Sequence, residues 1–565
     1  MHTPTSLGLG RRGFLRGVGA AAALTAGGST LAACGSGKAA AENKAGSAAQ
    51  VQLPTYTPLS NGPTPDLPGT DAGVPAGFYN YPASPTAAFT SPPLSGGKFS
   101  AMTPLFTAPP PGRGSNPAWQ AVEKKLGASV DITMVVGDDF DTKLSTLIAG
   151  GGLPDLIQYD GLAGVPTISN LPQFLDSQIA DLTPLIGGDK VKDYPHLAAI
   201  PKVFWEQCTV AGSLYFIPIP RGISAGAGLY RQDLFAAAGV TSTKDIKNAD
   251  DFLALLKELT NPGKDRYALA GNAGNGGYSG AIFEQIFGVP NKWRVDGAGK
   301  LTADIETDEF KAALEFMVKA AKAGCFYPGS QGWTKAKMED AFQSGKAALV
   351  YDGLPALSTS VWATAQKIDP NAKLMPFVPF GATGGPGVAW QDNVVFAGTM
   401  LKKADPAKLA EVLKIADFLA APFGTEEYLL KTYGVEGTDY TLDANHNPVQ
   451  TAQGKNDSNV TWKYVAAPQL VTYNPGVNAL TDAVHQAYTE LVPIALADPT
   501  ATLYSPTYGK QGVSLYKAVS DTVTQVIGGQ SSMSAFDSAV KTWRGNGGDQ
   551  IRSEFEQAYA GAPKS

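Results

Sequence analysis

Between residues 98 and 160 the chain alternates strand-like and helix-like segments, and this alternation constrains the fold more than any other feature of the sequence. The segments "GKFSAMTPLF", "ASVDITMVVG" and "LIQY" predict strands, the second because its apolar residues recur at every other position. Asn116 and Pro117 predict the start of a helix that reaches Leu126. A second helix is predicted from 138 to 149, with Phe140 and Leu144 on one face. Strands that alternate with helices in this way predict a parallel sheet with right-handed crossovers.

Similar elements follow along the rest of the chain. The segments "GSLYFIPIPR", "AALVYDG", "KLMPFVPFG" and "NVVFAG" predict further strands, and residues 249–260, 307–324 and 405–422 predict helices. The C-terminal part, from 506 to 565, is predicted to be mostly helical. Three acidic pairs are predicted to be helix starts and solvated faces: Asp138-Asp139, Asp250-Asp251 and Glu426-Glu427.

The N-terminal segment, up to Cys34, has the pattern of a bacterial export signal. Arg11, Arg12 and Arg16 precede an uncharged run from Val18 to Ala33, which is too short to span a bilayer. The segment "RRGFLR" resembles a twin-arginine signal, and "LAAC" resembles a lipobox that ends at Cys34. Fatty acyl chains such as palmitate on Cys34 would then hold the protein at the membrane, because two chains anchor stably. The alternative is an ordinary signal cleaved nearby, with Cys34 incidental.

Charge and cysteine content narrow the possible partners. The net charge of −6 becomes −9 when residues 1–33, with three arginines and no acids, are removed. Such an acidic chain is not expected to bind nucleic acid, which needs a basic face. No other segment has about 18 uncharged apolar residues in a row, so no further membrane span is predicted. Cys208 and Cys325 could pair, although two buried free thiols are favoured in a domain of this size.

Residues 34–97 are rich in Ala, Gly and Ser and then, from Pro54 to Pro93, in proline. We predict that this segment is an extended tether, which would span roughly 45 Å as a flexible coil. A proline-rich docking motif is the alternative.

The order of several segments resembles that in bacterial extracellular solute-binding proteins, family 1, which are the capture components of ABC importers. The segments are an export signal with a lipobox, "LPDLIQYD", "GSLYFIPIPR", "GLYRQDLFAAAGV", "FQSGKAALVYDG" and "QDNVVFAG". The segment "YGVEGTDYTLDANHNPV" resembles a feature of the long oligosaccharide-binding lipoproteins of that family. The resemblance covers Lys98 to Ala560. The long proline-rich segment and "GGYSGAIFEQIFGVPNKWRVDGAGK" depart from the family pattern.

The resemblance implies an α/β fold of two lobes, the type-2 periplasmic-binding-protein fold, with an inter-lobe cleft, hinge strands and a helical C-terminal region. It assigns 98–220 and about 385–435 to the first lobe, and 221–384 and about 436–565 to the second lobe and C-terminal helices. It implies a monomeric, membrane-anchored extracellular receptor without cofactor or metal, which closes on a carbohydrate, an oligosaccharide in particular, and hands it to the permease of an ABC importer. A secreted carbohydrate-active hydrolase and a structural surface lipoprotein remain as alternatives.

Candidate ligand contacts follow from where the predicted strands end. Ligands of open α/β sheets bind beyond the carboxyl ends of the strands, and sugars suit aromatic faces with charged hydrogen-bonding partners. Asp160, Arg221 and the pair Tyr351 and Asp352 each follow a predicted strand. Helix caps or surface ion pairs are the alternative for the charged residues, and core packing is the alternative for Trp333, Trp362 and Trp390 in loops or element ends. The predicted ligand-binding residues are Asp160, Arg221, Tyr278, Trp333, Tyr351, Asp352, Trp390 and Asn393.

Signals for catalysis or metal binding are weak. The segment "GISAG" matches the G-x-S-x-G pattern around Ser224, but no helix is predicted directly after it. The three histidines after the signal, His196, His446 and His485, are far apart in the sequence and form no H-E-x-x-H motif. The segment "DANHNP" begins like a calcium loop but has Pro448 at the sixth position, so a β-turn between short strands is predicted. A glycoside hydrolase would need only two well-placed carboxylates, which this pattern leaves open.

Overall fold

The computed structural model describes residues 51–70, 72–162, 168, 170–210, 212–222, 228–271, 280–391, 394–501 and 503–561, which lie in the unit Lys44–Ser565. The predicted export signal and Cys34 lie outside these residues. So do Tyr278 and Asn393 of the predicted site, and Ser224 of the G-x-S-x-G segment.

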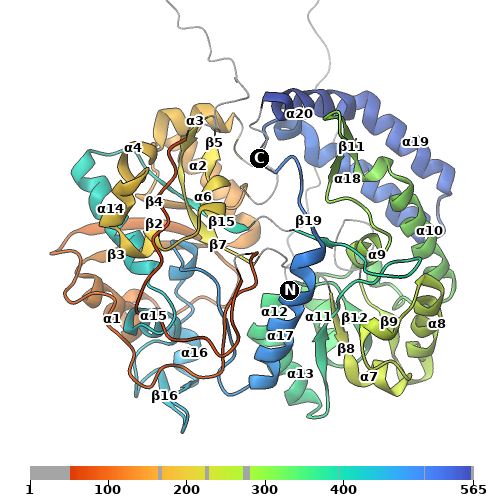
Figure 1. The fold of residues 1–565 in the computed structure, drawn as a ribbon, viewed down its shortest axis with the longest axis horizontal. Coiled ribbons are helices and arrows are strands. Elements are labelled where there is room, and N and C mark those ends of the chain that lie inside the picture. The colour runs from red at the N-terminus through yellow and green to blue at the C-terminus, as the bar shows by residue number, and fades with distance from the viewer. Residues whose placement is uncertain are drawn as a thin grey trace, which may run out of the picture. The chain divides into compact units, whose positions relative to one another are not determined.

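Five strands in the order β3-β2-β4-β15-β7 form the first sheet (Figure 1). Strands β2 and β3 are parallel, β4 is parallel to β2, and β15 runs antiparallel to both β4 and β7. The predicted parallel sheet is therefore present, with one antiparallel strand that arrives from much later in the chain. The strands are β2 (Lys98–Leu105), β3 (Ser129–Val136), β4 (Leu156–Tyr159), β7 (Phe216–Pro220) and β15 (Val395–Leu401).

Both predicted helices lie between these strands. The first has the predicted bounds, whereas the second begins at Phe140 rather than at residue 138, because Gly137–Asp139 form a 3₁₀ turn. Helix α1 (Pro117–Leu126) is capped by Asn116, whose side chain accepts a 2.9 Å hydrogen bond from the Trp119 amide. Helix α2 (Phe140–Gly150) buries Phe140 and Leu144. Because β3 and β4 lie on opposite sides of β2, right-handed crossovers place α1 and α2 on opposite faces of the sheet.

Four strands in the order β13-β8-β12-β9 form a second sheet. Strands β12 and β9 are parallel, while β8 is antiparallel to β12 and β13. Helix α8 (Ala249–Leu259) buries Phe252, Leu255, Leu256 and Leu259, and α10 (Asp308–Lys322) packs with the C-terminal helices. The strands are β8 (Leu229–Arg231), β9 (Tyr267–Leu269), β12 (Ala347–Val350) and β13 (Leu374–Pro376), and the C-terminal helices are α18 (Pro506–Ile527), α19 (Met533–Trp543) and α20 (Asp549–Gly561).

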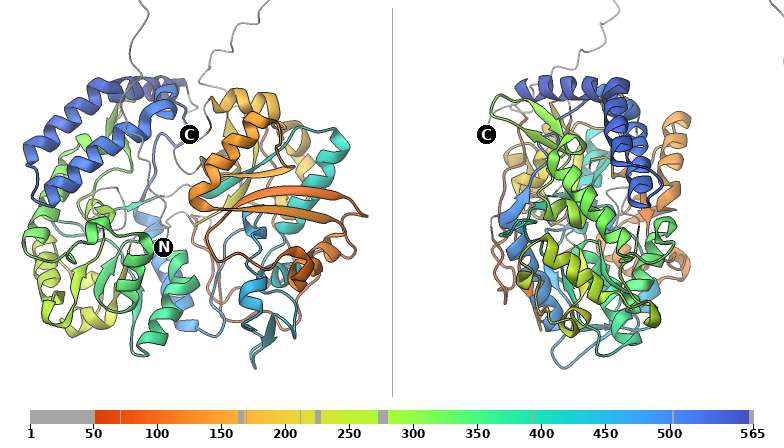
Figure 2. Two further views of the ribbon diagram at one scale, coloured as in Figure 1. Left: turned by 180° about the vertical axis from the view of Figure 1, so that it is seen from behind. Right: turned by 90° about the vertical axis from the view of Figure 1, so that its right-hand side faces the viewer.

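Each sheet has its own hydrophobic core, and we call the two parts the first and the second lobe (Figures 1 and 2). Further elements of the first lobe are α3 (Leu171–Gln178), α4 (Thr183–Ile186), α5 (Pro195–Ala198), α6 (Lys202–Glu206), β5 (Thr209–Val210), β6 (Ser213–Leu214), α14 (Pro406–Leu419), α15 (Glu426–Tyr433), β16 (Tyr440–Leu442), β17 (Pro448–Gln450) and α16 (Gly454–Asp457). Those of the second lobe are α7 (Gln232–Ala237), α9 (Gly280–Ile286), β10 (Trp293–Val295), β11 (Leu301–Ala303), α11 (Lys335–Gln343), α12 (Leu354–Ala356), α13 (Trp362–Ile368) and α17 (Asn478–Leu491).

The predicted last change of lobe, near residue 436, is wrong. Val460, Trp462 and Val465 are buried in the core of the first lobe. The hydroxyls of Thr461 and Thr103 are 2.6 Å apart, which ties this segment to β2. The chain therefore stays in the first lobe to about residue 466 and joins the second lobe at α17. The segment has little periodicity, and its few apolar residues are buried only because α1 and β2 lie beside them.

Three segments connect the lobes, and the described residues of all three meet α17 or the strand that follows it. In the first, a Cβ atom on Gly222 would lie 2.6 Å from the ring of Tyr488 in α17. In the second, β14 (Ala389–Trp390) pairs with β19 (Ala495–Leu496) just after α17. The third contains β18 (Thr472–Tyr473), directly before α17, and pairs with β1 (Gly77–Phe78). Helix α17 therefore lies at the junction between the lobes.

The prediction of a tether over 34–97 is wrong for residues 51–97, which pack on the lobes and which we call the strap. Four of its apolar side chains are buried: Val74, Phe78, Tyr81 and Leu94. The Thr57 amide donates to the Ala198 carbonyl at 2.8 Å, and the Ala88 amide donates to the Glu427 carboxylate at 2.8 Å. Because its prolines fix φ, the strap loses less conformational entropy on docking in an extended form than a chain without prolines would lose.

Glu427 also departs from the prediction of a solvated face for the pair Glu426-Glu427. Both residues lie in the first turn of α15, as predicted, but the Glu427 side chain is fully buried. Its carboxylate accepts the Ala88 and Phe89 amides and lies 3.4 Å from the Lys125 ammonium. The residue therefore holds the strap to the first lobe.

Other predictions from local sequence can be compared directly. Cys208 and Cys325 are both buried and free, each in the core of a different lobe. The "DANHNP" segment forms the turn between β16 and β17, with the His446 amide bonded to the Asp443 carbonyl, as predicted. Among the helices of the described ranges, none is long and apolar enough to cross a membrane.

Hydrogen exchange will test the docking of the strap. The amides of Thr57, Ala88 and Phe89 donate to the first lobe, so peptides from 54–60 and 85–91 should exchange much more slowly than an unstructured chain. Exchange measured by mass spectrometry, with the denatured protein as the reference, provides the comparison. Complete exchange of both peptides at the unstructured rate would restore the tether interpretation.

Candidate functional site

The carboxyl ends of the parallel strands of the first sheet meet at one edge. Strand β4 ends at Tyr159 and is followed by Asp160, and β7 ends at Pro220 and is followed by Arg221. Strand β15 begins at the same edge, because Val395 pairs with Pro220 in its antiparallel register. The structure thus brings Asp160 and Arg221 to one edge of one sheet, where ligands of open α/β sheets bind.

Three aromatic side chains that the sequence analysis did not select gather at this edge, and we call them the aromatic triad. They are Phe106, just after β2, Phe396 in β15, and Tyr464. The Phe396 and Tyr464 rings stack with centroids 5.4 Å apart, and Phe106 packs edge-to-face against them at 6.2 and 5.6 Å. Phe106 is 57% exposed, so the triad offers an apolar ring surface to solvent.

Glycine at position 137 helps to place the Phe106 ring. A Cβ atom there would lie 2.9 Å from the Phe106 ring, closer than carbon atoms approach without contact strain. The ring is therefore supported by the backbone that follows β3, as well as by Phe396 and Tyr464. An exposed ring held from three sides is suited to stacking against a flat ligand face.

Two cationic side chains flank the triad. The Arg221 guanidinium carbon lies 5.5 Å from the centroid of the Phe396 ring, and the Lys463 ammonium lies 5.2 Å from the centroid of the Tyr464 ring. Neither cation has an ion pair among the described residues. Desolvation lowers the pKa of Lys463, although its side chain is exposed, and desolvation raises the pKa of Tyr464 against the effect of Arg221. This edge therefore combines aromatic faces with positive charge.

Asp160 lies beside a second carboxylate at the same edge. Its Oδ1 atom is buried and has no hydrogen-bond partner among the described residues, and the same holds for Oδ1 of Asp141 in the first turn of α2. Desolvation and the neighbouring charge of Asp141 raise the pKa of Asp160. Two carboxylates with unused acceptors can take hydrogen bonds from hydroxyl groups of a ligand.

In the second lobe, Tyr351 and Asp352 follow β12, as predicted, but Asp352 is only 7% exposed. Its Oδ1 accepts from the Lys335 ammonium at 3.2 Å and from the Gly353 amide at 2.7 Å. Burial and the neighbouring Asp352 raise the pKa of Glu339, while Lys335 acts in the opposite sense. Asp352 is therefore a buried carboxylate that joins α11 to the end of β12, close to the ion-pair alternative that the sequence left open. Tyr351 is half-buried against the core of the same lobe.

The three tryptophans lie apart from the triad, since the structure shows no ring contact between them and its members. Trp333 packs on the Tyr327 ring at 4.7 Å, and the Lys337 ammonium covers it at 4.5 Å. The indole N–H of Trp390 donates to the Val289 carbonyl at 2.9 Å. Trp362 is half-buried at the start of α13. These contacts resemble the core-packing alternative that the sequence analysis left open.

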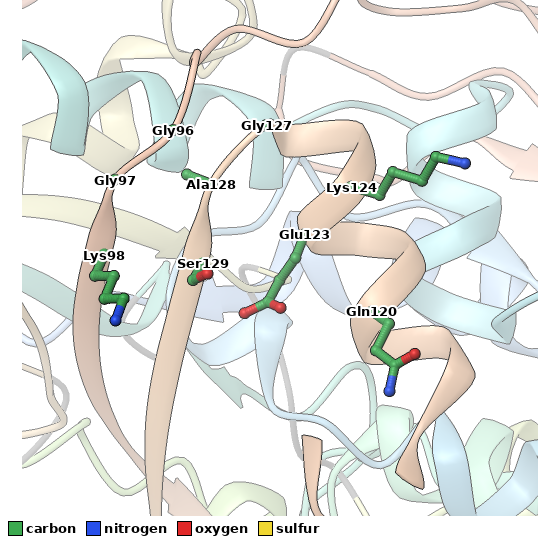
Figure 3. Close-up of a pocket in the computed structure, with 9 residues that line it drawn as sticks. All are labelled: Gly96, Gly97, Lys98, Gln120, Glu123, Lys124, Gly127, Ala128 and Ser129. Carbon is green, nitrogen blue, oxygen red and sulfur yellow. The ribbon is translucent and has the colours of Figure 1, made fainter. Parts of the chain in front are cut away.

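A hollow in the first lobe lies at the other end of β2 and β3 (Figure 3). Lys98 and Ser129, which line it, are the first residues of these two strands, whereas Phe106 and Asp160 lie just beyond the carboxyl ends of β2 and β4. The rule for ligand position in α/β sheets therefore favours the triad edge.

Sequence reasoning could have found part of the triad. Phe106 is the last residue of the predicted strand segment "GKFSAMTPLF", so a search of strand ends like the one that selected Asp160 could have included it. Phe396 lies within a predicted strand, and Tyr464 lies in a segment assigned to the wrong lobe. Their proximity to Phe106 depends on the pairing of β15 with β4, which no local pattern indicates.

Two α/β lobes with separate cores, joined by three connecting segments and bearing candidate contacts at strand ends, define a receptor of the type-2 periplasmic-binding-protein fold. The chain belongs to the bacterial extracellular solute-binding protein family, whose model matches residues 113–426. The resemblance seen in the sequence is thereby confirmed. Members of this family, and the solved structures that share the fold, are binding proteins.

Two relatives come from Bacillus subtilis (strain 168). The polygalacturonan/rhamnogalacturonan-binding protein YtcQ is 26% identical over 479 residues, which cover 82% of this chain and 91% of the relative. The lipoprotein LipO is 25% identical over 489 residues, which cover 83% of this chain and 94% of the relative.

Solved structures share the fold at low sequence identity. The alginate-binding protein AlgQ2 has a TM-score of 0.58 at 15% identity, and covers 84% of this chain and 99% of its own. An extracellular solute-binding protein from Bifidobacterium longum subsp. infantis has a TM-score of 0.60 at 13% identity, with coverage of 84% and 99%.

Replacement of Asp352 by alanine should lower stability. The variant loses a buried acceptor of two hydrogen bonds and leaves Lys335 without this partner, at a cost of about 1–3 kcal/mol in the free energy of unfolding. Urea denaturation followed by circular dichroism measures the change. Asp340→Ala, which removes an exposed carboxylate from α11, the helix that carries Lys335, is the control and should cost much less. Equal stability of the two variants would contradict a structural role for Asp352.

Proposed function

We propose that this protein is a lipid-anchored receptor on the outer side of the cell membrane, which captures an oligosaccharide and delivers it to the permease of an ABC importer. The aromatic triad with Arg221, at the carboxyl edge of the first sheet, is the observation that carries this proposal. Membership of a solute-binding family and relatedness to a polygalacturonan-binding protein and to a lipoprotein support it.

The chemistry of a sugar matches this edge. A pyranose ring has apolar C–H faces that stack on aromatic rings, and the half-exposed Phe106 provides such a ring. Sugar hydroxyls donate to carboxylates, and Asp160 and Asp141 have unused acceptor atoms. We infer that the triad binds a sugar ring and that the two carboxylates bind its hydroxyl groups.

The cations at this edge favour an acidic sugar. Arg221 and Lys463 flank the triad without an ion pair among the described residues. The carboxylate of a uronate whose ring stacks on the triad could pair with these two cations. Guanidinium groups bind carboxylates through two parallel hydrogen bonds. The ability of YtcQ to bind polygalacturonan, a polymer of acidic sugars, is consistent with this preference.

In this proposal the ligand is captured without the formation or cleavage of any covalent bond. The lobes close on the ligand by motion about the connecting segments, and the closed complex is what the permease receives. The protein acts as a monomer without a cofactor. The paired carboxylates Asp160 and Asp141, one of them with a raised pKa, are the feature that a hydrolase would share, so a bound oligosaccharide should also be examined for cleavage.

Phe106→Ala should weaken binding of an oligogalacturonide about tenfold or more, which corresponds to about 1.4 kcal/mol, because the exposed ring of the triad is lost. Isothermal titration calorimetry of the two proteins with oligogalacturonides and with neutral oligosaccharides of equal length gives the affinities. Val513→Ala, which removes an equally exposed apolar side chain on α18, is the control and should bind as the parent does. If Phe106→Ala binds with the parental affinity, the triad is not part of the ligand site. Steady cleavage of the ligand would show that the protein is a hydrolase and not a receptor.

Cys34→Ser should release the protein from the membrane, because the proposed lipid attachment is lost and no described helix can span a bilayer. Cells that express the parent or the variant are fractionated, and both fractions are blotted. Equal recovery of the two proteins with the membranes would contradict the lipid anchor, whereas sugar binding by the released variant should be unchanged.

A further inference from the structure

The strap binds the first lobe at both of its ends. Near its start, Thr55 and Thr57 donate to the carbonyls of Gly188 and Ala198 at 3.0 and 2.8 Å. Near its end, the Leu94 amide donates to the Leu126 carbonyl at the end of α1 at 3.2 Å. These bonds fix both ends of the strap to one rigid body.

The middle of the strap is instead bonded to α17 of the second lobe. The Tyr79 hydroxyl donates to Oδ1 of Asp482 at 2.5 Å, and this bond raises the pKa of Tyr79. Nε2 of His485, one turn further along α17, is 3.1 Å from the Pro68 carbonyl oxygen. Val74 is buried in the same core as the apolar face of α17. The strap therefore reaches from the first lobe to the second and back.

The strap also runs alongside one of the segments that connect the lobes. Strand β1 pairs in parallel with β18, and the Thr472 amide donates to the Ala76 carbonyl at 2.8 Å. Beside this pair, the Phe78 and Phe423 rings stack at 4.4 Å, and the Tyr81 hydroxyl donates to the Thr425 carbonyl at 2.6 Å. The red to orange trace that passes α17 in Figure 1 follows this course. The connecting segment that contains β18 is thus reinforced by the strap.

We propose that the middle of the strap positions the hinge: Tyr79, through Asp482 on α17, biases the lobes toward the arrangement in this structure and so sets the affinity for ligand. Movement of the second lobe about its connections displaces α17 relative to the first lobe, to which the strap ends are fixed. The bonds from Tyr79 and Pro68 to α17 then lengthen or break, so their free energy enters the equilibrium between lobe arrangements. The effect on affinity rests on the proposed function, whereas the effect on the lobes does not.

The experiment measures the lobe arrangement without ligand. Gln120→Cys on α1 and Lys319→Cys on α10, both at exposed positions, accept spin labels in the full chain carrying Cys34→Ser. The native Cys208 and Cys325 are buried and should not react. Double electron–electron resonance then gives the distribution of distances between lobes. In Tyr79→Phe and Asp482→Ala we expect the distribution to move away from the distance in this structure.

Matched variants separate this role from a merely structural one. Tyr56→Phe removes a hydroxyl from the part of the strap that binds the first lobe and should leave the distribution unchanged. Asp482→Asn keeps an oxygen that can accept from Tyr79 and should restore the parental distribution. Unchanged distributions in both Tyr79→Phe and Asp482→Ala, with parental melting temperatures, would overturn the proposal.

Ligand titration completes the test. Affinity for oligogalacturonide should change by about threefold or more in Tyr79→Phe, upward if the distribution moves toward that of the liganded parent and downward if it moves away. A shifted distribution with unchanged affinity would overturn the coupling to ligand capture. Failure of the parent to bind any oligosaccharide would overturn the proposed function, while the distance measurements would still decide the role of the strap.

Discussion

The antiparallel pairing of β15 between β4 and β7 is the constraint on which the first lobe depends. This strand follows the second lobe in the chain and completes a sheet whose other strands all lie between Lys98 and Pro220. Every residue of β15 except Phe396 is buried, and the Thr399 hydroxyl donates to the Val465 carbonyl at 2.7 Å. The same strand carries Phe396 to the edge where Asp160 and Arg221 lie. Stability of the lobe and assembly of the candidate site therefore rest on one set of backbone hydrogen bonds.

Charged residues at strand ends divide into two kinds in this protein. Asp352 is buried and bonded to Lys335 and to the Gly353 amide, so its carboxylate serves the local packing of α11 and β12. Each of the two residues keeps one buried oxygen without a partner among the described residues, Oδ2 of Asp352 and Oδ1 of Asp160. Asp160 has no ion pair among those residues, and its pKa is raised by burial and by Asp141. A group whose hydrogen-bonding capacity is unused is the better candidate for ligand contact. The rule of strand ends predicts both Asp160 and Asp352 as ligand contacts, and only the partners of each carboxylate in the structure distinguish them.

The strap shows that composition and structure can disagree for a physical reason. A segment with many prolines and small residues lacks the apolar density to fold by itself. It packs here because a few apolar side chains enter existing cores and because surface carbonyls and the Glu427 carboxylate satisfy its amides. Nothing within residues 51–97 encodes these partners, and Glu427 belongs to a helix much later in the chain. The course of the strap along α17 is what connects it with the motion of the lobes.

The sequence by itself determined the local elements: α1 with its Asn116 cap, the strands at 129–136 and 156–159, the turn at Asp443, and the order of segments that indicates the family. Those features depend on periodicity, capping and turn chemistry over a few residues, which are legible in one stretch of chain. Tertiary structure alone decided that residues 51–97 are docked, that 460–466 belong to the first lobe, and that Phe106, Phe396 and Tyr464 meet. Each of these depends on contacts between residues far apart in the chain, which arise from packing and strand register rather than from any local preference.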